Sequence, residues 1–484
     1  MSAAEGRWEA VIGLEVHAQL MTRSKMFCRC GADYAHAPPN TRCCPVCLGL
    51  PGALPVINRR AIELTIRTGL ALGCRIAEFC RFDRKNYFYA DLMKGYQISQ
   101  YDLPLCTQGE LVYLLDGEER RAGITRVHLE EDTAKHLDRN GADGDYSLID
   151  VNRSGVPLIE IVGEPDLRTP DQARAYMRAL RGVLRYVGAS TGNMEEGALR
   201  CDVNVSVRPR GAAELGTKVE LKNLNSFRAI YNALRYEIGR QSELLEAGGR
   251  VVQETRGWDE QRGATVGQRT KEYAHDYRYF PEPDLPPLTP DRAWIEEISR
   301  AMPELPSARR ARYTAELGLT PYDAALLAAE REIAGFFDRT VELYPQPKTV
   351  ANWINGDVRR SLGDETIERV GLTPEGFAEL LGMVEGGDIN RAQGVQVLEE
   401  LVRSGGSPRR IADQRGFKQV SDAGQLAEAI EQAIASSPKS VADYRAGKTQ
   451  ALGFLVGQVM KATRGQANPA VVNRLLTERL AGDG

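Results

Sequence analysis

The chain has 484 residues, which is more than a single hydrophobic core normally organises, so about two to four domains are expected. Hydrophobic residues make up 42% and charged residues 26%, as in an ordinary globular protein. A net charge of −4 excludes nucleic-acid binding through bulk positive charge, so any such contact must come from local basic patches.

The compartment can be inferred from what the sequence lacks. No apolar run reaches membrane-spanning length, and the N-terminal M-S-A-A-E-G-R has no apolar signal-peptide core. We therefore expect a cytoplasmic protein without membrane contact. In that compartment the nine cysteines are expected to be thiols or metal ligands rather than disulfides.

The first predicted element is a strand from Trp8 to Leu20. Its even positions are apolar and its odd positions are mostly polar, a period of two that is typical of a half-buried strand. The even face would be buried, and the odd face would present Glu15 and His17 side by side. A carboxylate and an imidazole so placed indicate either a chemical site or a solvated face.

Cysteines follow in two close groups, C-R-C at 28–30 and C-C-P-V-C-L-G at 43–49. Two close pairs separated by a short loop are typical of a tetrahedral thiolate site, for which zinc is the default metal. The predicted zinc ligands are Cys28, Cys30, Cys44 and Cys47. Cys43 is the alternative to Cys44, and free thiols are the alternative to a metal site. Four thiolates leave no open position for a substrate, so we expect a structural role.

Capped helices and further strands follow, up to about Asp284. The helices are expected to begin after the N-cap residues Asn58, Thr169 and Ser226. The strands lie at 124–132, 199–208 and 217–223, and each alternates apolar residues with a polar face. An antiparallel sheet with one wet face gives this pattern. Because these faces mix acids and bases, they suit a concave sheet that holds a charged ligand, or equally a solvated face with cross-strand ion pairs.

Composition then divides the chain. The Pro-rich run at 281–290 cannot be a central strand or a helix interior, and helical apolar spacing follows it. Gly405-Gly406-Ser407-Pro408 marks a second boundary. We predict an α+β protein with an antiparallel-sheet cradle domain at 1–292, an all-α helical domain at 293–406 and a small all-α tail domain at 407–484.

Common nucleotide-binding motifs are missing. Gly447-Lys448-Thr449 resembles the end of a P-loop, but Ala442 stands where the first glycine should be, and the segment lies in helical sequence. No G-x-G-x-x-G follows a predicted strand. An ATP site in this chain would therefore lie outside the common nucleotide folds.

Long motifs along nearly the whole chain carry a resemblance to a known family. They include I-G-L-E-V-H (12–17), P-V-C-L-G-L-P-G-A-L-P-V (45–56), F-D-R-K-N-Y-F-Y (82–89), K-G-Y-Q-I-S-Q (94–100), H-L-E-E-D (128–132), M-E-E-G-A-L-R-C-D-V-N (194–204), E-L-K-N-L-N-S-F (220–227), D-Y-R-Y-F-P-E-P-D (276–284) and L-G-F-L-V-G-Q-V-M-K-A-T (452–463). With them the chain resembles the B subunit of the aspartyl/glutamyl-tRNA amidotransferases, the GatB family. Ala90, Met93 and the extra thiol of Cys43 depart from the family pattern.

The resemblance implies a two-step ligase reaction on a mischarged tRNA. ATP activates the side-chain carboxylate of glutamate on tRNA(Gln) or of aspartate on tRNA(Asn), and ammonia then displaces phosphate. The ammonia would come through a channel from a glutaminase A subunit, and a small C subunit would hold the two together. The mischarging aminoacyl-tRNA synthetase is a further possible partner. The sequence does not tell which amino acid is processed.

Joining two anions requires that their repulsion be neutralised by metal ions and basic side chains. The resemblance points to the Glu15/His17 pair as a metal-site element. The predicted catalytic residues and magnesium ligands are Glu15, His17, Glu130 and Glu220. Since magnesium rarely takes nitrogen, His17 would instead bind manganese or donate a hydrogen bond to phosphate. Glu131 is a weaker choice than Glu130.

Basic residues complete the predicted sites. The predicted substrate- and phosphate-binding residues are Lys218, Lys222, Arg200 and Asp202, with surface ion pairing as the alternative for the cations. The resemblance also implies a tRNA-binding surface on the tail domain, for which Lys448, Lys461 and Arg464 are the candidates. The competing hypothesis is a non-catalytic, zinc-containing tRNA-binding scaffold, whose acids would have no reason to converge.

Overall fold

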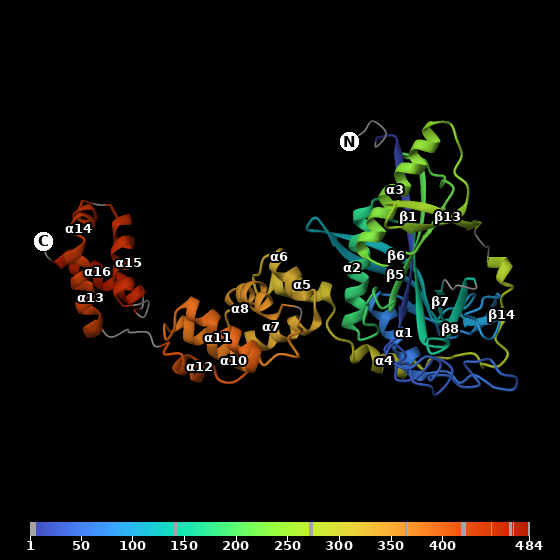
Figure 1. Cartoon of the computed structure of the whole chain (residues 1–484), viewed down its shortest axis with the longest axis horizontal. Coiled ribbons are helices and arrows are strands. Elements are labelled where there is room, and N and C mark those ends of the chain that lie inside the picture. Colours follow the sequence, from blue (N-terminus) through green and yellow to red (C-terminus); the bar gives the residue numbers. More distant parts are fainter. Residues whose placement is uncertain are drawn as a thin grey trace. The chain divides into compact units, whose positions relative to one another are not determined.

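The computed structural model describes residues 6–139, 144–270, 274–363, 365–417, 423–446, 448–463, 467 and 469–482. The chain divides into two compact units, Met1–Ala308 and Arg309–Gly484. Figure 1 shows the first unit as sheets with helices packed on them and the second as helices alone. This is the predicted α+β class.

One large sheet organises the first unit, and in the described part of the chain it has nine strands. In spatial order they are β13 (Ala264–Thr270), β12 (Glu254–Asp259), β11 (Val219–Lys222), β10 (Leu199–Pro209), β1 (Trp8–Gln19), β9 (Pro157–Gly163), β6 (Glu118–Glu131), β5 (Cys106–Leu115) and β2 (Arg75–Ile76). Neighbours are antiparallel, as predicted, except that β11 and β12 are parallel. A helix connects these two strands, which is the crossover that a parallel pair requires.

Smaller sheets lie beside it. The strands β14 (Phe280–Pro281), β3 (Asp83–Asn86) and β4 (Tyr96–Ser99) form one, and β7 (Lys135–Arg139) pairs with β8 (Tyr146–Asp150) in the other. A 3-10 turn, η2 (Ala274–Tyr277), precedes β14. Through β3 and β4, this part of the chain brings Lys85 and Gln97 to the polar side of the large sheet.

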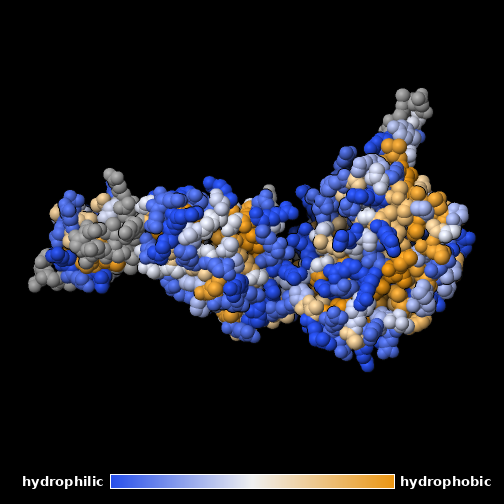
Figure 2. All heavy atoms as spheres, turned by 90° about the horizontal axis from the view of Figure 1, so that it is seen from below, coloured by the Kyte–Doolittle hydropathy of each residue, from blue (hydrophilic) through white to orange (hydrophobic). Residues whose placement is uncertain are grey.

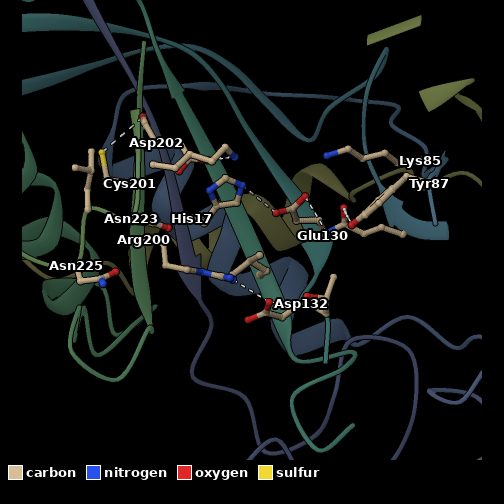
Figure 3. A pocket seen from close by; sticks show the side chains of 15 residues that line it. His17, Lys85, Tyr87, Glu130, Asp132, Arg200, Cys201, Asp202, Asn223 and Asn225 are labelled. Carbon is tan, nitrogen blue, oxygen red and sulfur yellow. Dashed lines mark hydrogen bonds and ion pairs between the residues drawn. The ribbon is translucent and has the colours of Figure 1, made fainter. Parts of the chain in front are cut away.

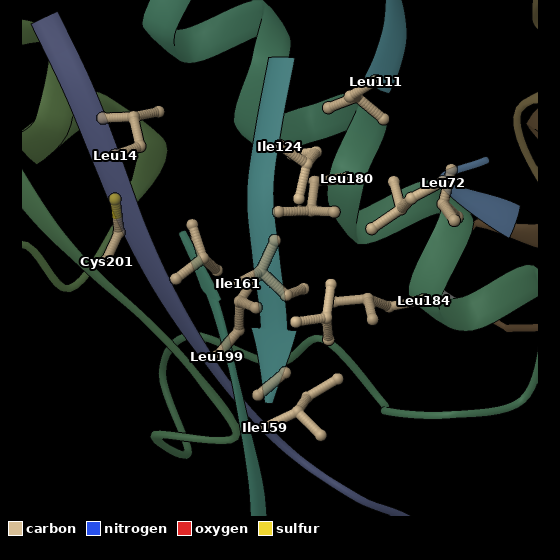
Figure 4. Packing of buried hydrophobic residues seen from close by; sticks show 14 of the residues in the cluster. Leu14, Leu72, Leu111, Ile124, Ile159, Ile161, Leu180, Leu184, Leu199 and Cys201 are labelled. Carbon is tan, nitrogen blue, oxygen red and sulfur yellow. The ribbon is translucent and has the colours of Figure 1, made fainter. Parts of the chain in front are cut away.

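The predicted period of two in β1 is confirmed. Ile12, Leu14, Val16 and Ala18 are at most 1% exposed, whereas Glu15 and His17 alternate with them on the half-buried face. Three helices cover the apolar side of the sheet: α1 (Arg59–Ala71), α2 (Pro170–Tyr186) and α3 (Phe227–Glu246). Figure 4 shows strand residues such as Ile161 packed against Leu180 and Leu184 of α2.

The three predicted N-caps are also confirmed. Asn58, Thr169 and Ser226 each accept hydrogen bonds from backbone N–H groups in the first turn of the helix that follows. At α2, Gln172 accepts a hydrogen bond in return from the Thr169 backbone N–H and completes a capping box. Local sequence therefore fixes where these helices begin.

Helices make up the rest of the chain. They are α4 (Arg292–Arg300), α5 (Pro306–Ala315), α6 (Pro321–Ala328), α7 (Arg331–Leu343), α8 (Pro347–Trp353), the π-helical η3 (Ile354–Val358), α9 (Arg359–Leu362), α10 (Pro374–Glu385), α11 (Arg391–Ser404), α12 (Pro408–Gln414), α13 (Ala423–Ser436), α14 (Pro438–Arg445), α15 (Gln450–Ala462) and α16 (Pro469–Gly482). The sequence N-P at 468–469 predicts Asn468 as the N-cap of the last helix, but this residue lies outside the described residues.

Core packing differs from the predicted boundaries in two places. Ile298 of α4 is buried in the core of the sheet unit, although the predicted helical domain begins at residue 293. Ile411 of α12 is buried in the same core as α7, α10 and α11, although the predicted tail begins at residue 407. A separate core, from Leu426 to Leu480, organises the last four helices. Buried apolar residues therefore extend the sheet unit past the Pro-rich segment and extend the helical domain past the Gly-rich segment.

The surface of the first unit is mixed in polarity. Figure 2 shows hydrophobic areas interspersed with hydrophilic ones on it. Large apolar side chains exposed there include Leu50 (48%), Leu54 (61%) and Val56 (74%). Among the described residues, no helix combines the length and the apolar character needed to span a membrane.

Candidate active site

Strand register aligns polar residues across the wet face of the large sheet. On β1, His17 lies opposite Glu160 of β9 and opposite Arg200 of β10. Glu160 in turn lies opposite His128 of β6. Across the four strands β6, β9, β1 and β10, the residues of this row are therefore His128, Glu160, His17 and Arg200.

The side chains of this row converge with a carboxylate from β6. His17 Nε2 lies 3.4 Å from Glu130 Oε1 and 3.5 Å from Glu160 Oε2. The Nε2 atom of His128 lies 3.4 Å from the same oxygen of Glu160. The possible ligand atoms of His17, Glu130 and Glu160 all lie within 4.8 Å of one another, which is a geometry that could hold a metal ion.

Glu160 is a site residue that the sequence analysis does not predict. It is the one charged residue in the apolar strand P-L-I-E-I-V-G, between the fully buried Ile159 and Ile161. The signal that could have found it is alternation, because an acid between two core residues must lie on the opposite face of the sheet. The surrounding apolar residues obscure this signal, since a single acid in seven residues does not make a polar face.

Charge interactions between His17 and the surrounding carboxylates stabilise the cluster. Burial by itself lowers the pKa of His17, but the hydrogen bond and charge of Glu160, with the charges of Glu130 and Asp202, raise it to about 9. Burial likewise opposes ionisation of Glu160, yet the two imidazoles hold the pKa of that carboxyl well below its usual range. Without a metal ion the site therefore holds a protonated His17 beside an ionised Glu160.

Two residues of the cluster, His17 and Glu130, line a cavity of about 340 Å³. Its other charged lining residues include Lys85, Asp132, Arg200, Asp202 and Lys222. Figure 3 shows Lys85, Asp132, Arg200 and Asp202 around the cavity, with His17 and Glu130 pointing toward one another. The volume lies in the range of small-molecule sites.

Ion pairs hold the cavity's cations in place. Arg200 lies 2.9 Å from Asp132, and Lys222 lies 2.9 Å from Asp202. Burial lowers the pKa of Lys222, but the carboxylate of Asp202 more than offsets this and raises it. Both cations are thus charged and anchored beside the cavity, where an anionic ligand would meet them. Three of the predicted phosphate-site residues, Arg200, Asp202 and Lys222, therefore lie together.

The remaining predicted residues lie in other rows: Glu15 is one row from His17, and Glu220 is two rows away. Glu15 and Lys218 line an adjacent pocket of about 260 Å³. The Asn204 amide donates to Glu15 Oε1 at 2.8 Å, and the Thr255 hydroxyl donates to Glu220 Oε2 at 2.7 Å. In the described part of the chain, neither Glu15 nor Glu220 belongs to a group of three possible ligand atoms within 4.8 Å. Of the four predicted metal-site residues, the structure brings His17 and Glu130 together.

Glu131 has a different environment from Glu130. Its carboxylate forms an ion pair with Lys94 and accepts a hydrogen bond from the backbone N–H of Ile98 at 3.1 Å. Glu130 instead accepts from the Gln97 amide at 3.3 Å, in addition to its contact with His17. Glu131 therefore ties β6 to β4, whereas Glu130 belongs to the cavity wall.

The predicted cysteine cluster also comes together. The sulfur atoms of four residues lie within 4.8 Å of one another, and these residues are Cys28, Cys30, Cys44 and Cys47. Cys43 turns away, because its thiol donates to the backbone carbonyl of Asn40 at 3.2 Å. Zn–S bonds of about 2.3 Å in a tetrahedron place sulfurs about 3.8 Å apart, close to the 3.9 Å between the Cys44 and Cys47 sulfurs.

One thiol of this cluster is prepared for ionisation. A hydrogen bond from Cys28, the backbone N–H of Cys44 and the nearby charge of Lys25 lower the pKa of Cys47 to about 5, against the effect of burial. A thiolate is the form that binds a metal ion. The positions of the four sulfur atoms therefore fit zinc, and Cys47 is disposed to bind it as a thiolate.

Two of the predicted tail residues are described, Lys448 in the loop before α15 and Lys461 in α15 itself. Lys448 is exposed and pairs with Asp443 at 2.9 Å, and Lys461 is exposed near the end of α15. Arg464 lies outside the described residues. Both described lysines are accessible to a polyanion.

Comparisons with known proteins agree with this architecture. Residues 10–296 match the family profile described as the GatB/GatE catalytic domain, and residues 335–480 match the profile described as the GatB domain. A protein of Moorella thermoacetica is 57% identical over 475 residues, covering 98% of this chain and 100% of the relative. Proteins of Carboxydothermus hydrogenoformans and Thermomicrobium roseum are 52% and 55% identical, each covering 98% of this chain and 99% of the relative. All three are named as the B subunit of an aspartyl/glutamyl-tRNA(Asn/Gln) amidotransferase.

Proposed function

This chain belongs to the GatB family, and we propose from this premise that it is the component of a tRNA-dependent amidotransferase that carries the ATP-dependent step. Its substrates would be glutamate on tRNA(Gln) or aspartate on tRNA(Asn), and its products glutaminyl- or asparaginyl-tRNA. The observation that carries the proposal is the charged cavity, which His17 and Glu130 line together with Arg200 and Lys222, with Glu160 clustered against His17 and Glu130.

The reaction would need the cavity to receive two anions. An oxygen of the substrate carboxylate attacks the γ-phosphorus of ATP, ADP leaves, and ammonia then attacks the acyl carbon and displaces phosphate. Arg200 and Lys222 would offset the negative charge of the phosphates. Because both are already held by Asp132 and Asp202, they would act without reorganising when the nucleotide binds.

His17, Glu130 and Glu160 would hold a divalent cation, with magnesium the expected ion and manganese the alternative that imidazole favours. When bound, the ion would neutralise phosphate charge as the carboxylate approaches. Glu15 and Glu220 remain proposed ligands from the same face of the sheet. When no metal is present, protonated His17 could instead donate a hydrogen bond to a phosphate oxygen.

Zinc at the four cysteines would have a structural role. It would tie the loop at residues 28–30 to the knuckle at 44–47, and both pack beside β6 and β9 through Lys25 and Gly155. The exposed Leu50, Leu54 and Val56 follow this knuckle and offer apolar surface for a partner. We propose that the glutaminase A subunit and the small C subunit are the partners of this chain in a cytoplasmic complex, with the mischarging synthetase a further one.

The test is an amidation assay. The purified chain and its A-type partner are mixed with mischarged tRNA, ATP and ammonium salt, and amide formation is measured together with tRNA binding. Loss of amide formation in Glu15→Ala with tRNA binding retained would favour the enzyme. Full activity in Glu15→Ala would remove that residue from the site, and full activity in Glu130→Ala and Glu160→Gln as well would leave only the scaffold hypothesis.

A further inference from the structure

A stripe of arginines follows one face of α2. Arg174, Arg178, Arg181 and Arg185 recur at intervals of four, three and four residues, which places them within about 60° of one another around the helix. They extend for about 16 Å along its axis. The buried residues of α2, such as Met177, Leu180 and Leu184, lie on another face. Arg178 and Arg185 are exposed, and the other two are half-buried.

Acids are absent from α2 after its first turn and from the first half of α3. Residues 172–186 contain no Asp or Glu, and neither do residues 227–236 of α3, which contribute Arg228 and Arg235. Arg174 pairs with Asp171. Among the described residues, Arg178 and Arg185 have no carboxylate partner. In a chain with a net charge of −4, such a concentration of cations is unusual.

Aromatic rings of α3 lie between the arginines. The guanidinium carbon of Arg174 lies 4.7 Å from the ring centre of Tyr231. Those of Arg178 and Arg181 lie 6.0 and 5.9 Å from the ring centre of Phe227. Figure 1 shows α2 and α3 together beside the large sheet, and their contacts agree.

One arginine is also held by the loop after its helix. A Cβ built on Gly192, at φ +64°, would lie 2.7 Å from Cγ of Arg181, so this glycine lets the loop close onto the arginine stem. The stripe is thus supported by aromatic rings and by backbone, rather than being a row of freely moving side chains.

The chain runs from the lining of the cavity to the aromatic ring beside two arginines of the stripe within a few residues. Asn223, Leu224 and Asn225 line the cavity, and α3 begins at Phe227. Two residues of chain span at most about 7 Å, so the ring under Arg178 and Arg181 lies close to the cavity lining. A polyanion bound along α2 could therefore present one end to the cavity.

We propose that Arg174, Arg178, Arg181 and Arg185, with Phe227 and Tyr231, form a phosphate-binding surface for the acceptor arm of the RNA substrate. This inference rests on the proposed function. RNA fits better than an acidic protein because arginines beside aromatic rings can meet both phosphates and unstacked bases. Phosphates along a backbone also match a linear series of cations.

The experiment uses the chain assembled with its A and C partners. Arg178→Glu/Arg185→Glu is compared with wild type for tRNA affinity across a range of salt concentrations and for amidation kinetics. We expect about tenfold weaker tRNA binding, a log–log salt slope less steep by about 1–2, a raised KM for tRNA and an unchanged kcat. Arg178→Gln/Arg185→Gln removes the two charges without reversing them, so it should weaken tRNA binding less. This variant replaces Arg178→Glu/Arg185→Glu in the test if the charge reversal impairs folding.

Arg120→Glu/Arg121→Glu is the matched control, because it reverses two exposed arginines at the tip of the β5–β6 hairpin in the same unit. Unchanged tRNA affinity and salt slope in the α2 variants would overturn the inference, even if wild type amidates normally. Loss of subunit assembly with tRNA affinity intact would also overturn it, in favour of an acidic protein partner. A wild-type complex that binds tRNA through this surface but forms no amide would overturn the proposed function alone.

Discussion

His17 and Glu160 are direct cross-strand neighbours, and the imidazole Nε2 of one lies 3.5 Å from a carboxylate oxygen of the other. Each changes the ionisation of the other, since the pKa of His17 is raised and that of Glu160 is lowered. Through His17, which lines the cavity, the pair influences the charge of the cavity wall. Glu160 also contacts His128, so one carboxylate orients two imidazoles.

Replacing this carboxylate tests its role in metal binding. In Glu160→Gln the cluster loses an anionic oxygen, and we expect binding of Mn²⁺, used as a spectroscopic probe, to weaken about 100-fold. The amidation rate at low metal concentration should fall in parallel. Glu164→Gln is the matched control, because Glu164 is an exposed acid four residues further along the chain. Equal Mn²⁺ affinity in the two variants would contradict a metal site at Glu160.

The ionisation of His17 makes a prediction about pH. A histidine whose folded pKa exceeds its unfolded value of about 6.5 stabilises the fold fully below 6.5, and this stabilisation is lost as the pH rises through the folded value. For His17 that window extends from about 6.5 to about 9. In EDTA, the unfolding free energy of wild type should fall across this window relative to His17→Gln, by at most about 3 kcal/mol.

The same ionisation can be observed directly by NMR. The His17 resonance of the metal-free protein should titrate near pH 9, and Glu160→Gln should lower its midpoint because the hydrogen bond and charge of Glu160 are lost. Glu164→Gln should leave the midpoint unchanged. A midpoint that does not move in Glu160→Gln would mean that other groups set the charge of His17.

Much of this site follows from patterns of period two. Alternation places His17, Glu130, Arg200, Asp202 and Lys222 on polar faces, and the structure gathers them around one cavity. Alternation does not give the order of strands in a sheet, which decides which residues meet. The insertion of β9 between β1 and β6 brings Glu160 to His17, and no local signal in either strand specifies that pairing.

The same reason explains why Glu15 and Glu220 are separated from the cluster. Each lies on the predicted face, but register sets Glu15 opposite Asp202 and Glu220 opposite Asn204 rather than opposite His17. The cysteine cluster is easier to predict, because short spacing within each pair limits the geometry. The domain boundaries are harder, since Ile298 and Ile411 anchor their helices through contacts distant in sequence.

The positions of their thiols predict different roles for the neighbouring residues Cys43 and Cys44. Cys44→Ser removes a sulfur of the cluster and should lower the zinc content from about one ion per chain to near zero, with a fall in Tm. Cys43→Ser should keep the zinc, because that thiol faces the Asn40 carbonyl. Metal content is measured by mass spectrometry after dialysis. Equal zinc content in the two variants would contradict Cys44 as a ligand.

The exposed lysines of the tail test a contact with tRNA that is separate from the cavity. In Lys448→Glu/Lys461→Glu, two cations that could meet phosphates become anions, so tRNA binding should weaken and its salt slope should become less steep by about 1–2. Amidation at saturating tRNA should keep its rate, since neither lysine lies in the sheet unit. Lys448→Arg/Lys461→Arg preserves both charges and should bind normally. Normal affinity in the reversed variant would instead assign these lysines to solvated surface, where the Asp443 pair already satisfies Lys448.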